Sequence, residues 1–182
     1  MKRKFVKESV ILMYRITILI LILIIVFLSF WILIPSLLVP NIFVLPELST
    51  LGYTQVAVTV EIGNESGTVK LAEKCYELSM VVDRSQAVSI DNGIKKIVSF
   101  RPNTHDLIND MLKSFDIKVI MVKVTEMKNN TYFAKLLLGQ RTFVLGLDSR
   151  PSDAIAIAAR TDYEVPIYVN ESLLKTVGKR TC

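Results

Sequence analysis

Residues 147–157 have the sequence LDSRPSDAIAI, which predicts the end of a strand, a tight turn and a buried helix in immediate succession. Pro151 is favoured at the first position of a helix, where its missing N–H is not needed. The alanines and isoleucines that follow are apolar on almost every side, which is typical of a helix enclosed by other elements. Residues 82–90 (VDRSQAVSI) repeat this order with two residues fewer, which indicates a duplicated β–β–α unit.

Apolar periodicity predicts most other elements between residues 52 and 178. Alternation with a period of two predicts strands at 56–62, 68–72, 76–82, 131–138 and 141–147, and a run that is apolar on both faces predicts a central strand at 117–125. Helical spacing predicts a helix at 104–115, with Thr104 as N-cap and an inward face of Leu107, Ile108, Met111, Leu112 and Phe115. We therefore expect an α+β fold, in which one mixed, mostly antiparallel sheet has its helices packed on one side.

The N-terminal part of the chain is much more apolar than the region from residue 52 to 178. Residues 16–34 (ITILILILIIVFLSFWILI) contain no charge, and as a helix they would be about 28 Å long, close to the hydrocarbon thickness of a bilayer. The sequence therefore predicts one transmembrane helix at 16–34, between a basic flank at 1–15 and a proline-containing linker at 35–51. A cleaved signal peptide is the alternative, but the apolar run is long for one and no small residues form a cleavage site after it.

The basic residues predict the orientation of this span. Five Lys or Arg residues precede it, and the next positive residue after it is Lys70. The positive-inside rule then places the N-terminus in the cytoplasm and the domain at 52–178, with its tail at 179–182, outside the cytoplasm. We thus expect a single-pass membrane protein.

Charge and composition limit the function. The first fifteen residues hold five of the 22 basic and one of the 17 acidic residues, which leaves 17 and 16 for the rest of the chain. The domain is therefore nearly neutral and gives no electrostatic sign of nucleic-acid binding. The single His excludes a mechanism with two histidines. Cys75 and Cys182 are most simply two free thiols, although outside the cell they can pair, or Cys182 can link two protomers.

Polar residues gather at the predicted ends of elements, in RPNTHD (101–106), DSRPSD (148–153) and Asp83–Arg84. An arginine beside aspartates can bind a phosphate while the carboxylates hold a divalent cation or orient water. The same residues also suit purely structural roles, since Asp153 lies where a helix dipole favours negative charge and Arg150 can pair with an aspartate. Residue chemistry alone favours the structural roles.

The segments 101–107 (RPNTHDL) and 147–157 resemble the two motifs typical of the bifunctional nuclease domain family, and the resemblance covers about residues 52–178. It implies a compact α+β domain that is commonly a homo-oligomer, with DNase and RNase activity in some members. By position, the motif residues are His105, Asp106, Asp148, Arg150, Pro151, Ser152 and Asp153. One departure is Arg84, which occupies a position that is usually acidic in relatives.

The resulting hypothesis is a membrane-anchored nuclease that hydrolyses phosphodiester bonds of DNA or RNA. We expect His105, Asp106, Asp148 and Asp153 to be catalytic and Arg150, Ser152 and Arg101 to bind the substrate. Asp148 and Asp153 would hold a Mg²⁺ or Mn²⁺ ion. The alternative is a catalytically silent, membrane-tethered binding or oligomeric assembly module, which the near-neutral domain and Arg84 support. The nuclease hypothesis requires that segments 105–106 and 148–153 meet at one hollow.

Overall fold

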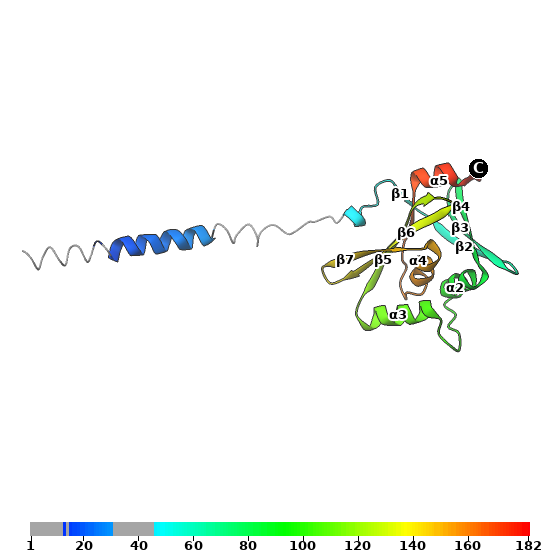
Figure 1. Cartoon of the computed structure of the whole chain (residues 1–182), viewed down its shortest axis with the longest axis horizontal. Helices are drawn as coiled ribbons and strands as arrows, with labels where there is room; N and C mark the ends of the chain where they lie inside the picture. The colour runs from blue at the N-terminus through cyan, green and yellow to red at the C-terminus, as the bar shows by residue number, and fades with distance from the viewer. Residues whose placement is uncertain (1–12, 14, 31–45) are drawn as a thin grey trace, which may run out of the picture. The chain divides into compact units, whose positions relative to one another are not determined.

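The computed structural model describes residues 13, 15–30 and 46–182 (Figure 1). The chain divides into two units, Met1–Val44 and Leu45–Cys182, which are considered separately. In the first unit, residues 15–30 are helical. None of the helices in the described ranges has both the length and the apolar character needed to cross a membrane. The predicted span at 16–34 includes residues 31–34, which lie outside the described residues, as do most of the predicted basic flank and of the linker.

The second unit contains two sheets. The first sheet has the strand order β1-β8-β5-β6-β7, and all its neighbours are antiparallel except β5 and β8. Its strands are β1 (Tyr53–Gln55), β5 (Lys118–Lys128), β6 (Thr131–Gln140), β7 (Phe143–Ser149) and β8 (Ile167–Asn170). The second sheet, in the order β2-β3-β4-β9, is fully antiparallel. It consists of β2 (Ala57–Ile62), β3 (Ser66–Glu73), β4 (Tyr76–Asp83) and β9 (Lys179–Arg180).

The predicted α+β class is confirmed, but the prediction of a single sheet was wrong. The reason lies at Val56, where the chain leaves one sheet for the other. Its N–H donates to the carbonyl of Ile167 at 2.9 Å, whereas the residues before it pair with β8 and those after it pair with β3. Apolar alternation begins only at Val56 and predicts no strand at residues 53–55, so the sequence pattern does not reveal the change of sheet.

Four α-helices of the second unit are α2 (Arg84–Ile94), α3 (Thr104–Ser114), α4 (Pro151–Ala158) and α5 (Glu171–Val177), and a 3₁₀ turn, η1 (Pro46–Leu48), precedes β1. The hairpin β3–β4 leads directly into α2, and the hairpin β6–β7 leads directly into α4. This order of elements matches the β–β–α repeat seen in the sequence. The two repeated helices pack against each other, and a Cβ on Gly93 of α2 would lie 3.0 Å from the Cβ of Ala159.

The predicted buried helix is confirmed as α4, which packs on β5, β6 and α2 near the middle of the domain (Figure 1). Residues 154–158 are all at most 6% exposed. They share one apolar core with side chains of both sheets, including Leu71, Leu78 and Val122. Burial of each large apolar side chain contributes about 1.5–3 kcal/mol. This packing fixes the position of the first turn of α4, which carries the second sequence motif.

The helix α3 is rotated from the predicted orientation. Ile108 and Leu112 pack inward, but Leu107, Met111 and Phe115 are 56%, 52% and 63% exposed. The N-cap is Asn103 rather than the predicted Thr104. Its side chain accepts from the N–H groups of His105 and Asp106, and the Asp106 carboxylate accepts from the Asn103 N–H, which completes a capping box. The helix presents a polar side to the domain because Asp106 has a buried cationic partner, described below.

The C-terminal residues are part of the fold. Cys75 and Cys182 form a disulfide with a Cα–Cα distance of 5.0 Å, so the prediction of two free thiols was wrong. The N–H of Thr181 also donates to the Cys75 carbonyl at 2.8 Å, and β9 pairs with the start of β4. The predicted tail at 179–182 is therefore joined to the second sheet.

Candidate active site

The two sequence motifs meet where the first turns of α3 and α4 approach each other. His105 Nε2 of α3 lies 3.4 Å from Asp153 Oδ1 of α4. Both side chains are largely buried, with exposed fractions of 16% and 26%. The structure thus brings together one residue of each motif. They meet at a contact between two helices, and packing against the core holds each helix in place.

Arg150 extends this contact toward the surface. Its Nε and Nη2 atoms donate to the two carboxylate oxygens of Asp153 at 2.7 and 3.2 Å, while its side chain stays 67% exposed. With its amide turned, Gln86 of α2 accepts from both Nη atoms of Arg150 at 3.1 Å. The hydrogen bond to Asp153 raises the pKa of Arg150 above its usual value, so the guanidinium stays charged. An exposed, permanently charged arginine of this kind suits an anionic ligand.

The ring of His105 is held from both sides. Its Nδ1 atom lies 2.9 Å from the hydroxyl oxygen of Ser89 in α2, opposite the contact of Nε2 with Asp153. Asn103 also donates to the Ser89 hydroxyl at 3.2 Å. A histidine with a hydroxyl on one nitrogen and a carboxylate on the other is oriented for proton transfer.

Asp106 is part of a buried ion pair. Its Oδ1 atom accepts from Arg160 Nε at 2.5 Å, and the two side chains are only 14% and 6% exposed. Arg160 also donates to the carbonyls of Ser89 and Ala156 at 2.9 and 2.8 Å. Burial acts to raise the pKa of Asp106, but the hydrogen bonds from Arg160 and from the Asn103 N–H outweigh it and lower this pKa. The geometry favours a structural role for Asp106, since it ties α3 to the end of α4.

Sequence reasoning missed Ser89 and Arg160. Ser89 lies among the apolar residues of α2, and its burial, at 6% exposure, was not evident from the pattern. A signal for Arg160 was present, because it is the first charged residue after the apolar run of α4. A charge next to a fully buried helix requires a partner.

Asp148 lies on the other side of the first sheet. Residues directly opposite each other in an antiparallel pair share a face, and Asp148 is opposite Lys135, whereas Leu147 is opposite Leu136 of the core. The ammonium of Lys135 pairs with Glu47 at 3.1 Å on that outer face. The side chain of Asp148 therefore points away from α4.

This placement bears on the predicted metal site. Asp148 and Asp153 lie on opposite sides of β7, and both oxygens of Asp153 accept from Arg150. Within the part of the chain that the structure describes, no group of three or more His, Cys, Asp or Glu residues is arranged to hold a metal ion. The residues present do not form a shared ligand set for the predicted Mg²⁺ or Mn²⁺ ion.

The two other predicted binding residues differ in position. Ser152 is 5% exposed in the first turn of α4 and borders a hollow of about 390 Å³. Arg150 and Gln86 line the same hollow, together with residues of β4 and of the β5–β6 turn. Arg101 is exposed in the segment between α2 and α3 and does not line this hollow. The hollow beside Arg150 provides space for a ligand at the first turn of α4, but neither His105 nor Asp153 is among its lining residues.

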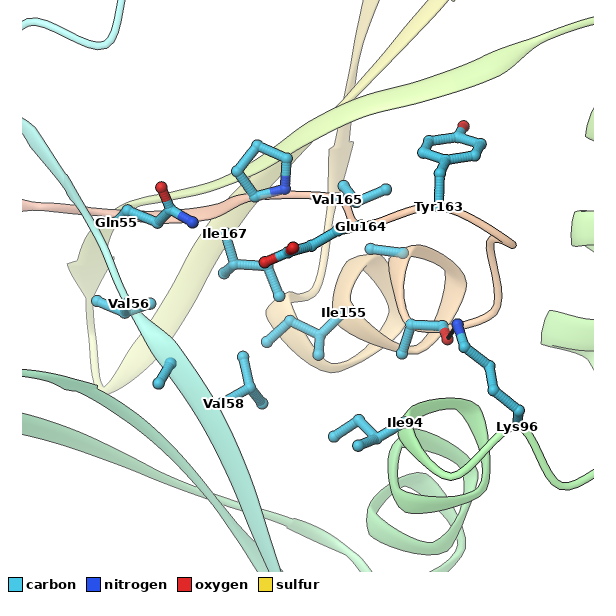
Figure 2. Close-up of a pocket in the computed structure, with 14 residues that line it drawn as sticks. Gln55, Val56, Val58, Ile94, Lys96, Ile155, Tyr163, Glu164, Val165 and Ile167 are labelled. Atoms are coloured by element: carbon cyan, nitrogen blue, oxygen red, sulfur yellow. Dashed lines mark hydrogen bonds between the residues drawn. The ribbon is translucent and has the colours of Figure 1, made fainter.

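A second hollow of about 310 Å³ lies between β2, the end of α2 and α4 (Figure 2). Its surface is mainly apolar, with Val58, Ile155 and Ile167 among the lining residues. Lys96 at its edge donates to the carbonyls of Ala159 and Thr161 at 2.8 and 2.5 Å. Because none of the predicted catalytic or binding residues lines this hollow, it does not belong to the candidate site.

Comparison with known proteins agrees with the motifs. A family model described as the bifunctional nuclease domain matches residues 69–181. An uncharacterized protein of Mycobacterium tuberculosis is 32% identical over 101 residues, which cover 56% of this chain and 58% of that protein. Bifunctional nuclease 2 of Arabidopsis thaliana is 33% identical over 106 residues, which cover 57% of this chain and 32% of the relative. Bifunctional nuclease 2 of Oryza sativa subsp. japonica is 29% identical over 130 residues, which cover 70% of this chain and 37% of that relative. The matched region is less than two thirds of each relative's length.

Proposed function

The chain belongs to the bifunctional nuclease domain family, and from this premise we propose that it hydrolyses phosphodiester bonds of DNA or RNA at the contact between α3 and α4. One observation carries the proposal. His105 lies 3.4 Å from Asp153, and Asp153 binds the exposed Arg150 beside an open hollow. The plant relatives that are named bifunctional nucleases support the same reaction.

Arg150 is the proposed phosphate-binding group. Its guanidinium is exposed and offers N–H groups in a planar array that fits two phosphate oxygens. In the free protein these groups donate to Asp153. A bound phosphate competes for the same donors, so substrate binding releases the Asp153 carboxylate next to the scissile bond. Ser152 borders the same hollow, and we propose that it also contacts the substrate.

His105 and Asp153 are the proposed proton-transfer pair. Water attacks phosphorus, the pair accepts its proton, and the bond from phosphorus to the leaving oxygen breaks. The same pair then returns the proton to the leaving oxygen. An imidazole ring can both accept and donate a proton, which suits both transfers. Ser89 keeps the ring in place through Nδ1 while Nε2 takes part.

The predicted divalent cation is not needed for these steps. Asp148 and Asp153 are not arranged as a ligand pair, so no step above passes through a metal ion. A requirement for Mg²⁺ or Mn²⁺ stays a prediction, and assays with and without EDTA test it.

The test compares the same substitution on the two sides of β7. Asp153→Asn removes a carboxylate from the proposed pair, whereas Asp148→Asn changes an exposed carboxylate on the opposite face. We expect Asp153→Asn to slow hydrolysis of labelled DNA and RNA by about 10²–10⁴-fold, the usual contribution of a general acid or base. The rate of Asp148→Asn should stay close to wild type. Full activity of Asp153→Asn would remove this carboxylate from the mechanism.

We also propose that residues 16–34 anchor the protein in a membrane, with the domain outside the cytoplasm. The Cys75–Cys182 disulfide supports the outside location, because structural disulfides persist mainly in oxidising compartments. Protease added to intact cells should then digest the domain but spare the N-terminus. A domain that becomes accessible only after cell lysis would contradict this orientation.

The second candidate is a catalytically silent binding or assembly module. It is favoured by the ion pairs in the free protein, since both Asp153 and Asp106 have arginine partners. In this case nucleic acid would bind without being cut, or would not bind at all. Salt-dependent binding in the absence of hydrolysis would support the binding module.

A further inference from the structure

The buried hydroxyl of Ser89 in α2 is in contact with three side chains from outside its own helix. Its Oγ atom lies 2.9 Å from His105 Nδ1, and it accepts from Asn103 Nδ2 at 3.2 Å and from Arg160 Nη2 at 3.0 Å. Among the residues that the structure describes, this hydroxyl has no other polar partner. The proton of Ser89 must therefore be directed at one of these three groups.

Two of the three partners can only donate to Ser89. Arg160 presents a guanidinium, which has N–H groups and no acceptor. The side-chain oxygen of Asn103 is already fixed, because it accepts from the N–H groups of His105 and Asp106 in the capping box. The amide nitrogen of Asn103 is thus the atom that faces Ser89, and the amide cannot turn around without loss of the cap.

The inventory of the Ser89 hydroxyl then decides where the proton of His105 lies. A serine hydroxyl has one hydrogen to donate and two lone pairs to accept. Asn103 and Arg160 take the two lone pairs, so the hydrogen is left for Nδ1 of His105. Nδ1 accepts this hydrogen and carries none of its own, so the hydrogen of the neutral ring is on Nε2, which faces Asp153 at 3.4 Å.

We propose that Asn103 and Arg160 are positioning residues that act through Ser89. They direct its hydroxyl hydrogen to His105 and so hold the ring as the tautomer with its proton on Nε2. Both ring nitrogens then face a hydrogen, so the carboxylate of Asp153 is the group that accepts the proton of the attacking water. The proton passes to Asp153 as water bonds to phosphorus, and then to the leaving oxygen as its bond to phosphorus breaks. The tautomer follows from the free protein, whereas the role of Asp153 as acceptor rests on the proposed function.

NMR measures the position of the ring proton without any substrate. His105 is the single histidine of the chain, so ¹⁵N-labelled histidine gives the signals of one imidazole from the full chain in detergent micelles. In mildly alkaline buffer an imidazole is neutral. We expect Nδ1 to have the chemical shift of a ring nitrogen without hydrogen and Nε2 that of an N–H. A protonated Nδ1 in wild type would overturn the proposal, whatever the variants do.

Asn103→Asp should move this proton to Nδ1. Aspartate is about as good an N-cap as asparagine, so one carboxylate oxygen can keep both capping hydrogen bonds. The other oxygen faces Ser89 as an acceptor, where the amide nitrogen was a donor. The Ser89 hydroxyl then donates to the carboxylate, and its freed lone pair accepts from Nδ1–H of His105. An unchanged Nδ1 shift in the folded variant would overturn the proposal.

Two controls separate the path through Ser89 from other effects of the new charge. Asn170→Asp makes the same change at the N-cap of α5, where the side chain also accepts from two backbone N–H groups, and should leave both ring signals unchanged. The double variant Ser89→Ala/Asn103→Asp has the charge but lacks the hydroxyl, so its ring signals should match those of Ser89→Ala. A change of the Nδ1 shift as large as in Asn103→Asp alone would overturn the role of Ser89.

Kinetics separate this proposal from the nuclease function itself. With its hydrogen on Nδ1, the ring no longer presents an N–H to Asp153, so Asn103→Asp should lower kcat by about 10²-fold with little change in KM. A reversed tautomer with the kcat of wild type would overturn the assignment of Asp153 as proton acceptor. Absence of hydrolysis by wild type as well as by the variants would refute the nuclease function, and the tautomer would still be decided by the NMR spectra.

Discussion

The buried pair of Asp106 and Arg160 should be a main determinant of stability at the site. We predict that Arg160→Leu lowers the free energy of unfolding by about 3–5 kcal/mol, the usual loss when one partner of a buried ion pair is removed. The structure accounts for this size. Arg160 donates to Asp106 Oδ1, to two backbone carbonyls and to the Ser89 hydroxyl, and its side chain is only 6% exposed. Leucine leaves all four acceptors without this donor and leaves the Asp106 charge without its partner.

Urea unfolding followed by circular dichroism measures this loss, with Arg101→Leu as the control. Arg101 is an exposed arginine in the segment before α3, so its replacement should change stability by less than about 0.5 kcal/mol. Asp106→Asn should lower the free energy of unfolding by less than Arg160→Leu does, because the amide oxygen of asparagine can still accept a hydrogen bond from the guanidinium. An Arg160→Leu protein as stable as Arg101→Leu would refute the reasoning.

The same pair predicts a pH dependence. The pKa of Asp106 is lowered in the folded state. Its contribution to the free energy of unfolding is therefore present above the pKa of the unfolded state, about 3.9, and is lost as the pH falls through the lower pKa of the folded state. Wild type should therefore lose stability in this acidic range, and Asp106→Asn should lose less. Equal losses in both proteins would contradict a charged Asp106 in the fold.

Three further predictions concern other parts of the domain. Cys75→Ser should lower the free energy of unfolding by about 4–5 kcal/mol, because the disulfide closes a long loop, and wild type treated with reductant should match it in urea unfolding. Ser89→Ala should reduce kcat more than it changes KM and should alter the pH profile, because it removes the contact of His105 Nδ1; a change in KM alone would contradict a positioning role. Gly67→Ala should destabilise the protein by about 1–3 kcal/mol, because the new methyl group would overlap Ala87 of α2, and a thermal melt equal to wild type would contradict this close approach.

Much of the fold could be predicted from local sequence. The order of strands and helices, the buried α4 and the β–β–α repeat follow from apolar periodicity and from Pro151. The division into two sheets could not be predicted, because it depends on the pairing of β1 with β8, which is distant in the sequence, whereas β2 pairs with the next strand, β3. The disulfide could not be predicted either, since spacing alone does not give the distance between Cys75 and Cys182.

The candidate site was predictable only in part. The motifs identified His105, Arg150 and Asp153, which the structure brings together. They did not show that Asp148 lies on the opposite face of the sheet, because the face depends on the register of β7 against β6. They also did not show that Asp106 forms an ion pair with Arg160, a residue outside both motifs. Pairing of buried charges is a property of the packed helices rather than of either segment.

A double-mutant cycle on kcat/KM tests most directly whether α3 and α4 form one catalytic unit. His105→Gln, Asp153→Asn and the double variant are measured on the same labelled substrate at neutral pH. If the two side chains handle the same proton, the double variant should be about as slow as the slower single variant. Losses that multiply in the double variant, or rates near wild type in all three, would contradict the account.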